Sequence, residues 1–213
     1  MHEELKKLRV VDDDALHQNA CVSTIKASKQ AAVLIPLVMH AEQWQILFIR
    51  RAQNKDDRHS GQVAFPGGRV EASDPNHEYA ALRETREEIG LNPSQVNVIG
   101  AIKPYVTISS YAVTPVVGVV KWPATLSLQA TEVARAFLIP MAWLRNRNNF
   151  TFRARESVSE DSARRNPIVV YEKFDGEVLW GATARMTLNF LKAIDEGHVP
   201  LPGKMGATDT TPH

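Results

Sequence analysis

Cysteine is almost absent from this chain of 213 residues, which contains only Cys21. A single cysteine cannot form an internal disulfide, so the sequence fits a reducing compartment. A long apolar run is missing as well, because the longest, residues 31–39, is too short to cross a bilayer. The charged N-terminus also lacks the apolar centre of a secretion signal. We therefore expect a soluble, cytoplasmic protein.

An excess of charge of one sign is also missing. Lys and Arg together number 25, Asp and Glu number 24, and the formal net charge is +1. Nothing in this balance requires nucleic acid or an anionic membrane as a partner. The histidines show no metal-ligand spacing, and the chain has no internal repeat and no linker that would divide it. The oligomeric state stays open, a homodimer included.

Apolar runs and turn residues outline the expected elements. Residues 31–39 and 45–50 predict two strands joined by a turn, and residues 51–61 predict a polar loop. Further strands are expected at residues 95–102, 111–120, 131–139, 150–155 and 167–174, and helices at residues 2–18, 140–146 and 182–194. Their irregular order predicts an α+β protein with a mixed sheet and helices on its faces.

The chain is expected to divide into three parts. Residues 1–30 form an N-terminal helical extension, and residues 31–195 form the main domain. Residues 196–213 have no core pattern and are expected to be disordered.

The most informative stretch covers residues 65–91 and reads FPGGRVEASDPNHEYAALRETREEIGL. Asp74 and Pro75 suit an N-cap and a first helical position. Gly90 suits the end of a helix. We therefore predict a helix from Pro75 to about Ile89.

Three glutamates gather on one side of this predicted helix. Glu84, Glu87 and Glu88 fall within roughly one third of its circumference at about 100° per residue. Like charges at this spacing destabilise an exposed helix by roughly 0.2–0.5 kcal/mol per pair. A hard divalent cation such as Mg²⁺ would offset that repulsion. The alternative is a solvated acidic face neutralised by Arg83 and Arg86.

The glycines before the helix point to a ligand. Gly67 and Gly68 allow a sharp backbone turn that brings a carbonyl or an amide close to a bound group. A double glycine followed by RETREEIGL resembles the Nudix box of the Nudix hydrolases, and the second half of the box is complete. The first half departs from the pattern. Its glutamate position, eight residues before the arginine, is Pro75 here, with Asp74 beside it.

The resemblance implies the Nudix fold, an α/β/α sandwich with a mixed β-sheet, and metal-dependent hydrolysis of a pyrophosphate bond. The metal would be Mg²⁺ or Mn²⁺. The implied catalytic residues are Glu84, Glu87, Glu88 and Arg83. Among them, Glu84 and Glu88 match the principal metal ligands, and Glu87 is either a further ligand or the anchor for Arg83. The general base varies within the family. Glu132 is one candidate, with an ordinary surface residue at a strand edge as the alternative.

The segment ILFIRRAQNKDDRHSGQVAFPGG resembles the signature of the coenzyme A pyrophosphatases, a branch of this family. This likeness implies cleavage of coenzyme A into 3′,5′-ADP and 4′-phosphopantetheine, with Arg51, Arg58, Gly67 and Gly68 as substrate-binding residues. The spacing from Arg51 to Gly61 is one residue longer than in that signature.

Coenzyme A also carries a 3′-phosphate, which requires a cation. Arg51, Lys55, Arg58 and His59 are candidates, since the forked donors of arginine suit phosphate. A solvated loop charge is the alternative for each of them, and Arg50 is similar. Trp180 could stack on adenine, with core packing as its alternative.

Two other functions remain open. The residues of the box act on the pyrophosphate and do not discriminate between substrates. ADP-ribose, a dinucleotide or an oxidised nucleotide would therefore serve as substrate equally well. A Nudix-fold binding module without catalysis would be expected to have lost its carboxylates, whereas all three glutamates of the box are present.

Overall fold

The computed structural model describes residues 8–10, 28–55, 59–155 and 167–201. Its strands are β1 (Leu8–Val10), β2 (Lys29–His40), β3 (Gln43–Arg51), β4 (Val63–Ala64), β5 (Gly67–Arg69), β6 (Val96–Ala101), β7 (Tyr105–Val106), β8 (Tyr111–Val120), β9 (Val133–Pro140), β10 (Phe150–Arg155), β11 (Ile168–Phe174) and β12 (Glu177–Trp180). Its helices are α2 (His77–Ile89), α3 (Met141–Arg145) and α5 (Gly181–Asp195), with 3-10 turns η2 (Pro93–Gln95) and η3 (Arg147–Asn149).

The larger sheet is mixed, as the sequence predicts. Its strands run in the order β4-β3-β2-β8-β6, with β5 also paired to β2, β7 to β8 and β9 to β3. The long central pair, β2 with β8, is parallel, whereas β2 pairs antiparallel with β3. Two left-handed residues, Ala41 and Glu42, make the tight turn between β2 and β3.

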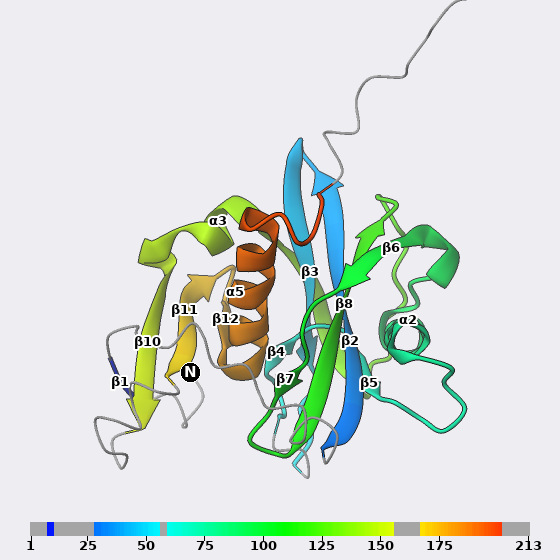
Figure 1. The fold of residues 1–213 in the computed structure, drawn as a ribbon, viewed down its shortest axis with the longest axis horizontal. Coiled ribbons are helices and arrows are strands. Elements are labelled where there is room, and N and C mark those ends of the chain that lie inside the picture. The colour runs from blue at the N-terminus through cyan, green and yellow to red at the C-terminus, as the bar shows by residue number, and fades with distance from the viewer. Residues whose placement is uncertain (1–7, 11–27, 56–58, 156–166, 202–213) are drawn as a thin grey trace, which may run out of the picture.

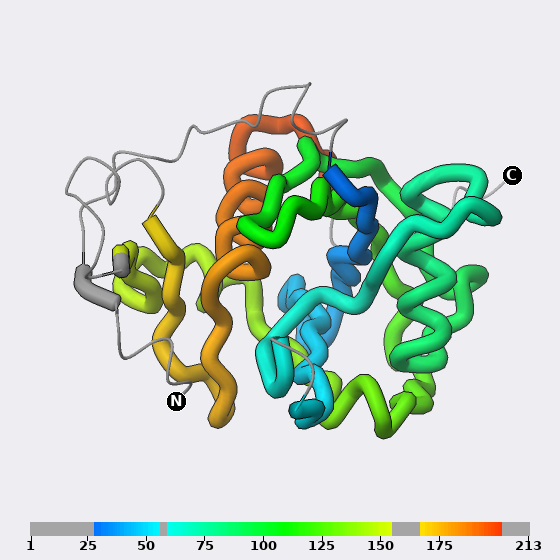
Figure 2. Tube along the Cα trace, turned by 90° about the horizontal axis from the view of Figure 1, so that it is seen from below, coloured from blue at the N-terminus to red at the C-terminus, as the bar shows by residue number. Residues whose placement is uncertain are grey.

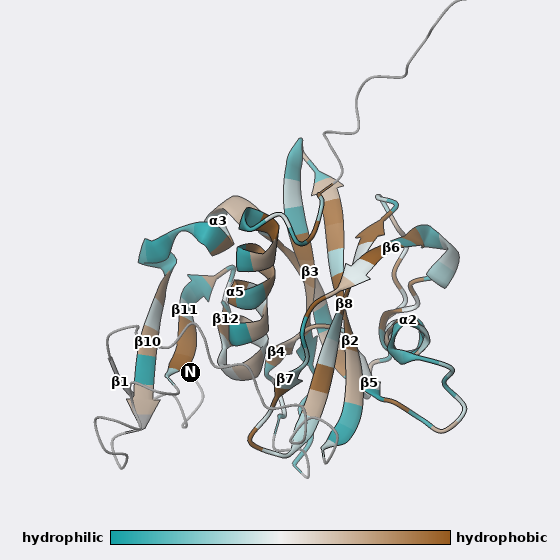
Figure 3. Ribbon diagram, in the orientation of Figure 1, coloured by the Kyte–Doolittle hydropathy of each residue, from teal (hydrophilic) through white to brown (hydrophobic). Residues whose placement is uncertain are grey.

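Strand β2 is buried on both faces, which explains its unbroken apolar run. Alternate side chains of a strand point to opposite faces. Ile35 and Leu37 belong to one buried cluster, together with residues of α5, and Leu34 and Val38 belong to another, together with residues of α2. We name these the α5-side cluster and the α2-side cluster. Figure 3 shows the resulting apolar bands in the middle of the sheet.

The neighbour of β2 changes halfway along the strand. Residues Leu37–His40 pair with β3, whereas Ala31–Val33 pair with β5. Pro36, which has no N–H to donate, lies between the two pairings. The chain can therefore leave β3, make the loop and β4, and return beside β2 as the double-glycine strand β5.

A second sheet contains β1, β10, β11 and β12 in that order. Helix α5 lies between this sheet and the larger one, and α2 covers the opposite face of the larger sheet (Figure 1). The view from below in Figure 2 shows the same arrangement. The result is the expected sandwich of helices around a mixed sheet, with an additional four-stranded sheet outside α5.

The N-terminal prediction is wrong where it can be compared. Leu8–Val10 form strand β1, antiparallel to β10, although the sequence predicts a helix over residues 2–18. The other residues of that span lie outside the described part of the chain, as do Cys21, Arg58 and residues 202–213. The boundaries at residues 30 and 195 stay predictions. None of the helices in the described ranges has the length and hydropathy to cross a membrane.

Candidate functional site

The double glycine brings the backbone of β5 against both β2 and α2. Gly67 has φ +143°, and a Cβ there would collide with the backbone of Ala32 and Val33. At Gly68 a Cβ would lie 2.5 Å from the carboxyl carbon of Glu84. Only glycine fits at Gly67, because backbone occupies the space of a side chain there, whereas a side chain at Gly68 would have to displace the Glu84 carboxylate.

Helix α2 begins two residues later than the sequence predicts. Its N-cap is Asn76, whose side-chain oxygen accepts a hydrogen bond from the Tyr79 amide at 2.8 Å. Asp74 is therefore not the cap, and Pro75 is not in the first turn. The predicted end is confirmed: Ile89 is the last helical residue, and Gly90 follows in the left-handed region with φ +71°.

The three glutamates of the box lie in very different environments. Glu88 is 3% exposed, whereas the side chains of Glu84 and Glu87 are 18% and 57% exposed. The helix thus presents a gradient from a buried carboxylate near its C-terminal end to a solvated one beside it.

Glu88 is held by the backbone of β5. Its Oε2 accepts a hydrogen bond from the Gly67 amide at 2.9 Å, and its Oε1 lies 3.9 Å from Nη1 of Arg51. Burial raises the pKa of Glu88 to about 7, against the opposing effects of the Gly67 amide and Arg51. The charges of Glu84 and Glu132 raise it further. A carboxylate in this position lacks enough positive charge nearby, which is the property expected of a cation ligand.

Glu84 lies against Gly68 and beside Arg83. Its Oε1 accepts a hydrogen bond from Arg83 Nη1 at 3.1 Å. Burial nevertheless raises the pKa of Glu84, and the charges of Glu87 and Glu132 add to this effect. In both Glu84 and Glu88 the charged form is therefore disfavoured, since both are partly desolvated acids on one side of α2.

Arg83 connects the helix to the turn that precedes it. Its Nε and Nη2 each donate to one oxygen of Asp74, at 3.0 Å in both cases, and Nη2 also donates to the Arg69 carbonyl at 3.1 Å. Nη1 donates to Glu84 and also to Glu87, at 3.1 Å. These contacts support the interpretation of Glu87 as the anchor of Arg83.

Asp74 occupies the place of the acid that the first half of the box lacks at Pro75. Its side chain has no exposed surface, and its paired hydrogen bonds with Arg83 hold its pKa below the ordinary value of an aspartate. Asp74 lies in the segment before α2, one position before the place where the box pattern has its glutamate. The acid is therefore displaced along the sequence, but it still contacts the arginine of the box.

Glu132 lies close to the site without belonging to the box. The segment before β9 is attached to the end of α2, since the amides of Ser127 and Gln129 donate to the carbonyls of Ile89 and Glu88 at 2.9 and 2.8 Å. The Ala52 amide donates to the Glu132 carbonyl at 2.7 Å. The Glu132 side chain is exposed, and its charge reaches both Glu84 and Glu88.

The other predicted cations do not gather at one point. Arg51 faces Glu88, and Lys55 and His59 are exposed, with His59 Nδ1 lying 3.1 Å from Oε1 of Gln62. Arg50 lies on the other face of β3, with its Nε 3.7 Å from Oε1 of Glu177. Trp180 is half-buried at the start of α5. Among the predicted cations that the structure describes, Arg51 is therefore the one brought to the carboxylates, and Arg58 lies outside the described residues.

The carboxylates fit a hard divalent cation. Within the described ranges, no three Asp, Glu, His or Cys side chains already stand together as a complete ligand set. Mg²⁺ does not require such a set, since it binds through one or two carboxylates and takes its other ligands from water and substrate phosphates. Glu84 and Glu88, partly desolvated and short of positive charge, are the two acids that suit it.

Comparison with known proteins agrees with the geometry. Residues 28–160 match the family model of the NUDIX domain. An uncharacterized Nudix hydrolase, NudL, of Citrobacter koseri is 37% identical over 154 residues, which cover 71% of this chain and 70% of that protein. The Escherichia coli K12 protein of the same name is 43% identical over 116 residues, or 54% of this chain and 58% of its own length.

A solved structure has the same fold at low sequence identity. The Nudix hydrolase RenU of M. smegmatis superposes with a TM-score of 0.55 at 16% sequence identity, and the match covers 83% of this chain and 90% of that one. At this identity the likeness concerns the fold alone.

Proposed function

The chain belongs to the Nudix family of pyrophosphohydrolases, and we propose that its substrate is coenzyme A or a derivative of it. The products would be 3′,5′-ADP and 4′-phosphopantetheine. The observation that carries the reaction is the environment of Glu88, a buried carboxylate that faces Arg51 at the end of β3. The site thus combines an acid suited to a cation with an arginine suited to phosphate.

We propose Glu84 and Glu88 as the residues that would hold Mg²⁺ or Mn²⁺. Such an ion screens the charge of a pyrophosphate and lowers the pKa of water. Glu88 is held by the Gly67 amide, and Glu84 lies against Gly68 and accepts a hydrogen bond from Arg83, so both carboxylates have defined positions. Glu87 serves chiefly to orient Arg83.

Arg51 and Glu132 have complementary proposed roles. Arg51 lies beside Glu88 and would contact an oxygen of the pyrophosphate, with Arg58 as a second cation from the same loop. Glu132 is exposed and its charge acts on both Glu84 and Glu88, so it would accept a proton from the attacking water.

The choice of coenzyme A rests on the loop sequence that leads into the double glycine. Two described parts of that signature support the choice, since Arg51 at the end of β3 faces Glu88 and the Gly67 amide of FPGG donates to Glu88. The relatives are named only as Nudix hydrolases, and ADP-ribose, dinucleotides and oxidised nucleotides remain the competing substrates.

Product analysis tests this proposal. Purified protein is incubated with coenzyme A and Mg²⁺ or Mn²⁺, and the products are identified by mass spectrometry. We expect release of 4′-phosphopantetheine and 3′,5′-ADP, and no release after chelation of the metal. Intact coenzyme A beside cleaved ADP-ribose or dinucleotide would overturn the substrate and leave the reaction class in place.

A further inference from the structure

A second group of cations lies beside the site, on the other side of β5 from the carboxylates. Lys29 opens β2, Arg69 closes β5 and Tyr111 opens β8. The strand register places Lys29 opposite Tyr111 and Arg69 opposite Ala31. Three adjacent strands therefore bring these residues to the same end of the sheet, and we name them the Lys29–Arg69 patch.

Both cations lie over the same aromatic ring. The Nζ of Lys29 is 5.8 Å from the centroid of the Tyr111 ring, and the Cζ of Arg69 is 5.6 Å from it. A cation is attracted to the face of a ring at this distance. The ring carries no net charge, however, so it orients the two cations without neutralising them.

The patch has unbalanced positive charge. Among the residues that the structure describes, no carboxylate lies within 4.0 Å of Lys29 or Arg69, and both side chains are exposed. Other arginines near the site differ in this respect: Arg83 binds Asp74, and Arg51 faces Glu88. Two oriented cations without an anion form a site for one, and a phosphate monoester has oxygens for a guanidinium fork and an ammonium at the same time.

The backbone connects the patch to the carboxylate site. Arg69 directly follows Gly68, and its carbonyl accepts the hydrogen bond from Arg83 Nη2 at 3.1 Å. At about 3.3 Å per residue of strand, the Arg69 backbone lies within roughly 7 Å of the Gly67 amide that holds Glu88. A group bound at the patch therefore lies next to the carboxylate site, not within it.

We propose that Lys29 and Arg69 form a subsite for a phosphate monoester of the substrate that is not cleaved. This inference rests on the proposed function, under which that group is the 3′-phosphate of coenzyme A. Arg51 is less suited to the same task, because Glu88 already faces it. The patch would make the enzyme prefer nucleotides with a phosphate beyond the pyrophosphate.

Binding of a product tests the subsite without any turnover. Calorimetry on the full chain with chelator compares 3′,5′-ADP with 5′-AMP, which lacks the second phosphate. We expect the wild type to bind 3′,5′-ADP more tightly. Lys29→Ala and Arg69→Ala should each reduce this preference by roughly ten-fold or more, the usual effect of losing a hydrogen bond to a charged group.

Two control variants sharpen the test. Lys121→Ala removes the same charge as Lys29→Ala from an exposed lysine that follows the opposite end of β8, and should leave the preference unchanged. Tyr111→Phe keeps the ring and should keep the preference, whereas Tyr111→Leu removes the ring and should weaken it.

The outcomes separate this inference from the proposed function. Equal affinity of the wild type for 3′,5′-ADP and 5′-AMP would overturn the subsite, and so would a preference that both alanine variants keep. A preference lost in Arg58→Ala but kept in both patch variants would assign the phosphate to the loop instead. If coenzyme A is not cleaved but the preference depends on Lys29 and Arg69, the substrate proposal fails and the subsite stands.

Discussion

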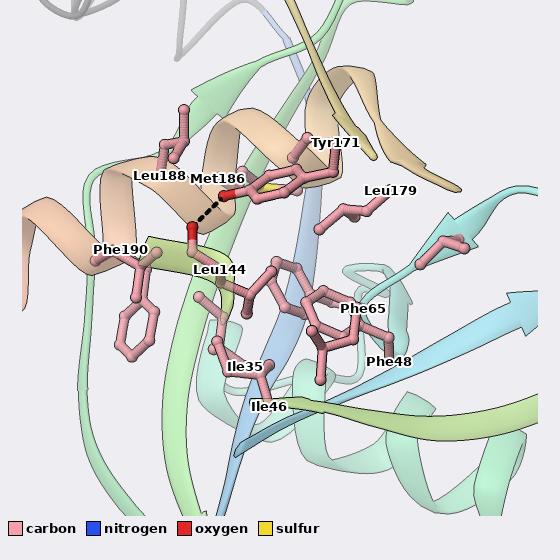
Figure 4. Packing of buried hydrophobic residues seen from close by; sticks show 14 of the residues in the cluster. Ile35, Ile46, Phe48, Phe65, Leu144, Tyr171, Leu179, Met186, Leu188 and Phe190 are labelled. Atoms are coloured by element: carbon pink, nitrogen blue, oxygen red, sulfur yellow. Dashed lines mark hydrogen bonds between the residues drawn. The ribbon is translucent and has the colours of Figure 1, made fainter. Parts of the chain in front are cut away.

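The two faces of the larger sheet are made by the same strands but bury different kinds of side chain. On the α5 side, Phe48 stacks on Phe65 with ring centroids 4.9 Å apart, and the buried polar group of Tyr171 is satisfied by the Leu144 carbonyl at 3.1 Å (Figure 4). On the α2 side, the apolar cluster ends at Glu88, an acid buried against a backbone amide. The α5 side buries aromatic rings and a phenol whose hydroxyl is hydrogen-bonded, and the α2 side buries a carboxylate whose charge is costly.

This difference indicates where stability and function lie. A buried carboxylate disfavours its charged form, so Glu88 contributes little to folding at neutral pH. The packed aromatic side chains of the α5 side belong to the other buried cluster and contribute to stability. Substitutions on the two faces should therefore separate activity from stability.

The largest effect is expected at Glu88. Glu88→Gln keeps an oxygen that can accept from the Gly67 amide but loses the charge that would bind the cation. Since a metal ion contributes several kcal/mol to the transition state, turnover should fall roughly a thousand-fold or more, with an unchanged or higher melting temperature. Steady-state kinetics and calorimetric melting on the same preparation check this. Retention of most of the rate would remove Glu88 from the metal site.

The opposite pattern is expected at Phe48. Phe48→Ala deletes a side chain with no exposed surface, and the free energy of unfolding should fall by about 3–5 kcal/mol. The rate per folded molecule should stay close to that of the wild type, measured well below the melting temperature. Phe48→Leu is the matched control and should cost less than about 1.5 kcal/mol. A large loss of rate in a fully folded Phe48→Leu protein would show that the two faces are coupled.

The charge of Glu88 should also appear in the pH dependence of stability. Burial raises the pKa of Glu88 to about 7 from 4.5, so the folded protein retains a proton that the unfolded chain has lost between these values. In chelator, the stabilising contribution of this proton is complete below about pH 4.5 and is lost as the pH rises through 7. Urea unfolding at pH 5 and pH 8 should give a difference up to about 3 kcal/mol larger in the wild type than in Glu88→Gln. Identical differences in the two proteins would contradict the raised pKa.

The smallest effect is expected at Tyr171. Burial raises the pKa of this phenol, so it stays protonated and donates to the Leu144 carbonyl. Tyr171→Phe keeps the ring and leaves that carbonyl without its donor, at a cost of about 1 kcal/mol. Thermal unfolding measures this loss, and kinetics should show no change in turnover. A substantial loss of activity would place the α5 side in the catalytic machinery.

The sequence predicts best where the pattern is local and strong. The unbroken apolar run of β2 and the glycine after Ile89 both predict what the structure has, because burial on two faces and a left-handed helix end impose these residues directly. The spacing of the glutamates predicts one shared side of α2. Spacing alone does not predict which of them is buried, since that depends on where β5 approaches the helix.

The wrong predictions have a tertiary cause. Asp74 and Pro75 form a reasonable N-cap pattern, yet the Asp74 carboxylate binds Arg83 and the cap falls to Asn76. The strand at Leu8–Val10 pairs with β10, whose residues are more than a hundred positions away in the sequence. A local sequence pattern cannot predict such a contact. The Lys29–Arg69 patch likewise depends on strand register and is invisible in the linear sequence.

Direct binding of Mn²⁺ tests the central claim that the buried carboxylates hold a cation. The electron paramagnetic resonance signal of free Mn²⁺ is followed as wild type, Glu88→Gln and Glu78→Gln are titrated, the last being an exposed acid in the first turn of the same helix. We predict that the wild type and Glu78→Gln remove Mn²⁺ from solution with the same affinity and that Glu88→Gln binds it at least ten-fold more weakly. Equal binding by all three proteins would contradict the account.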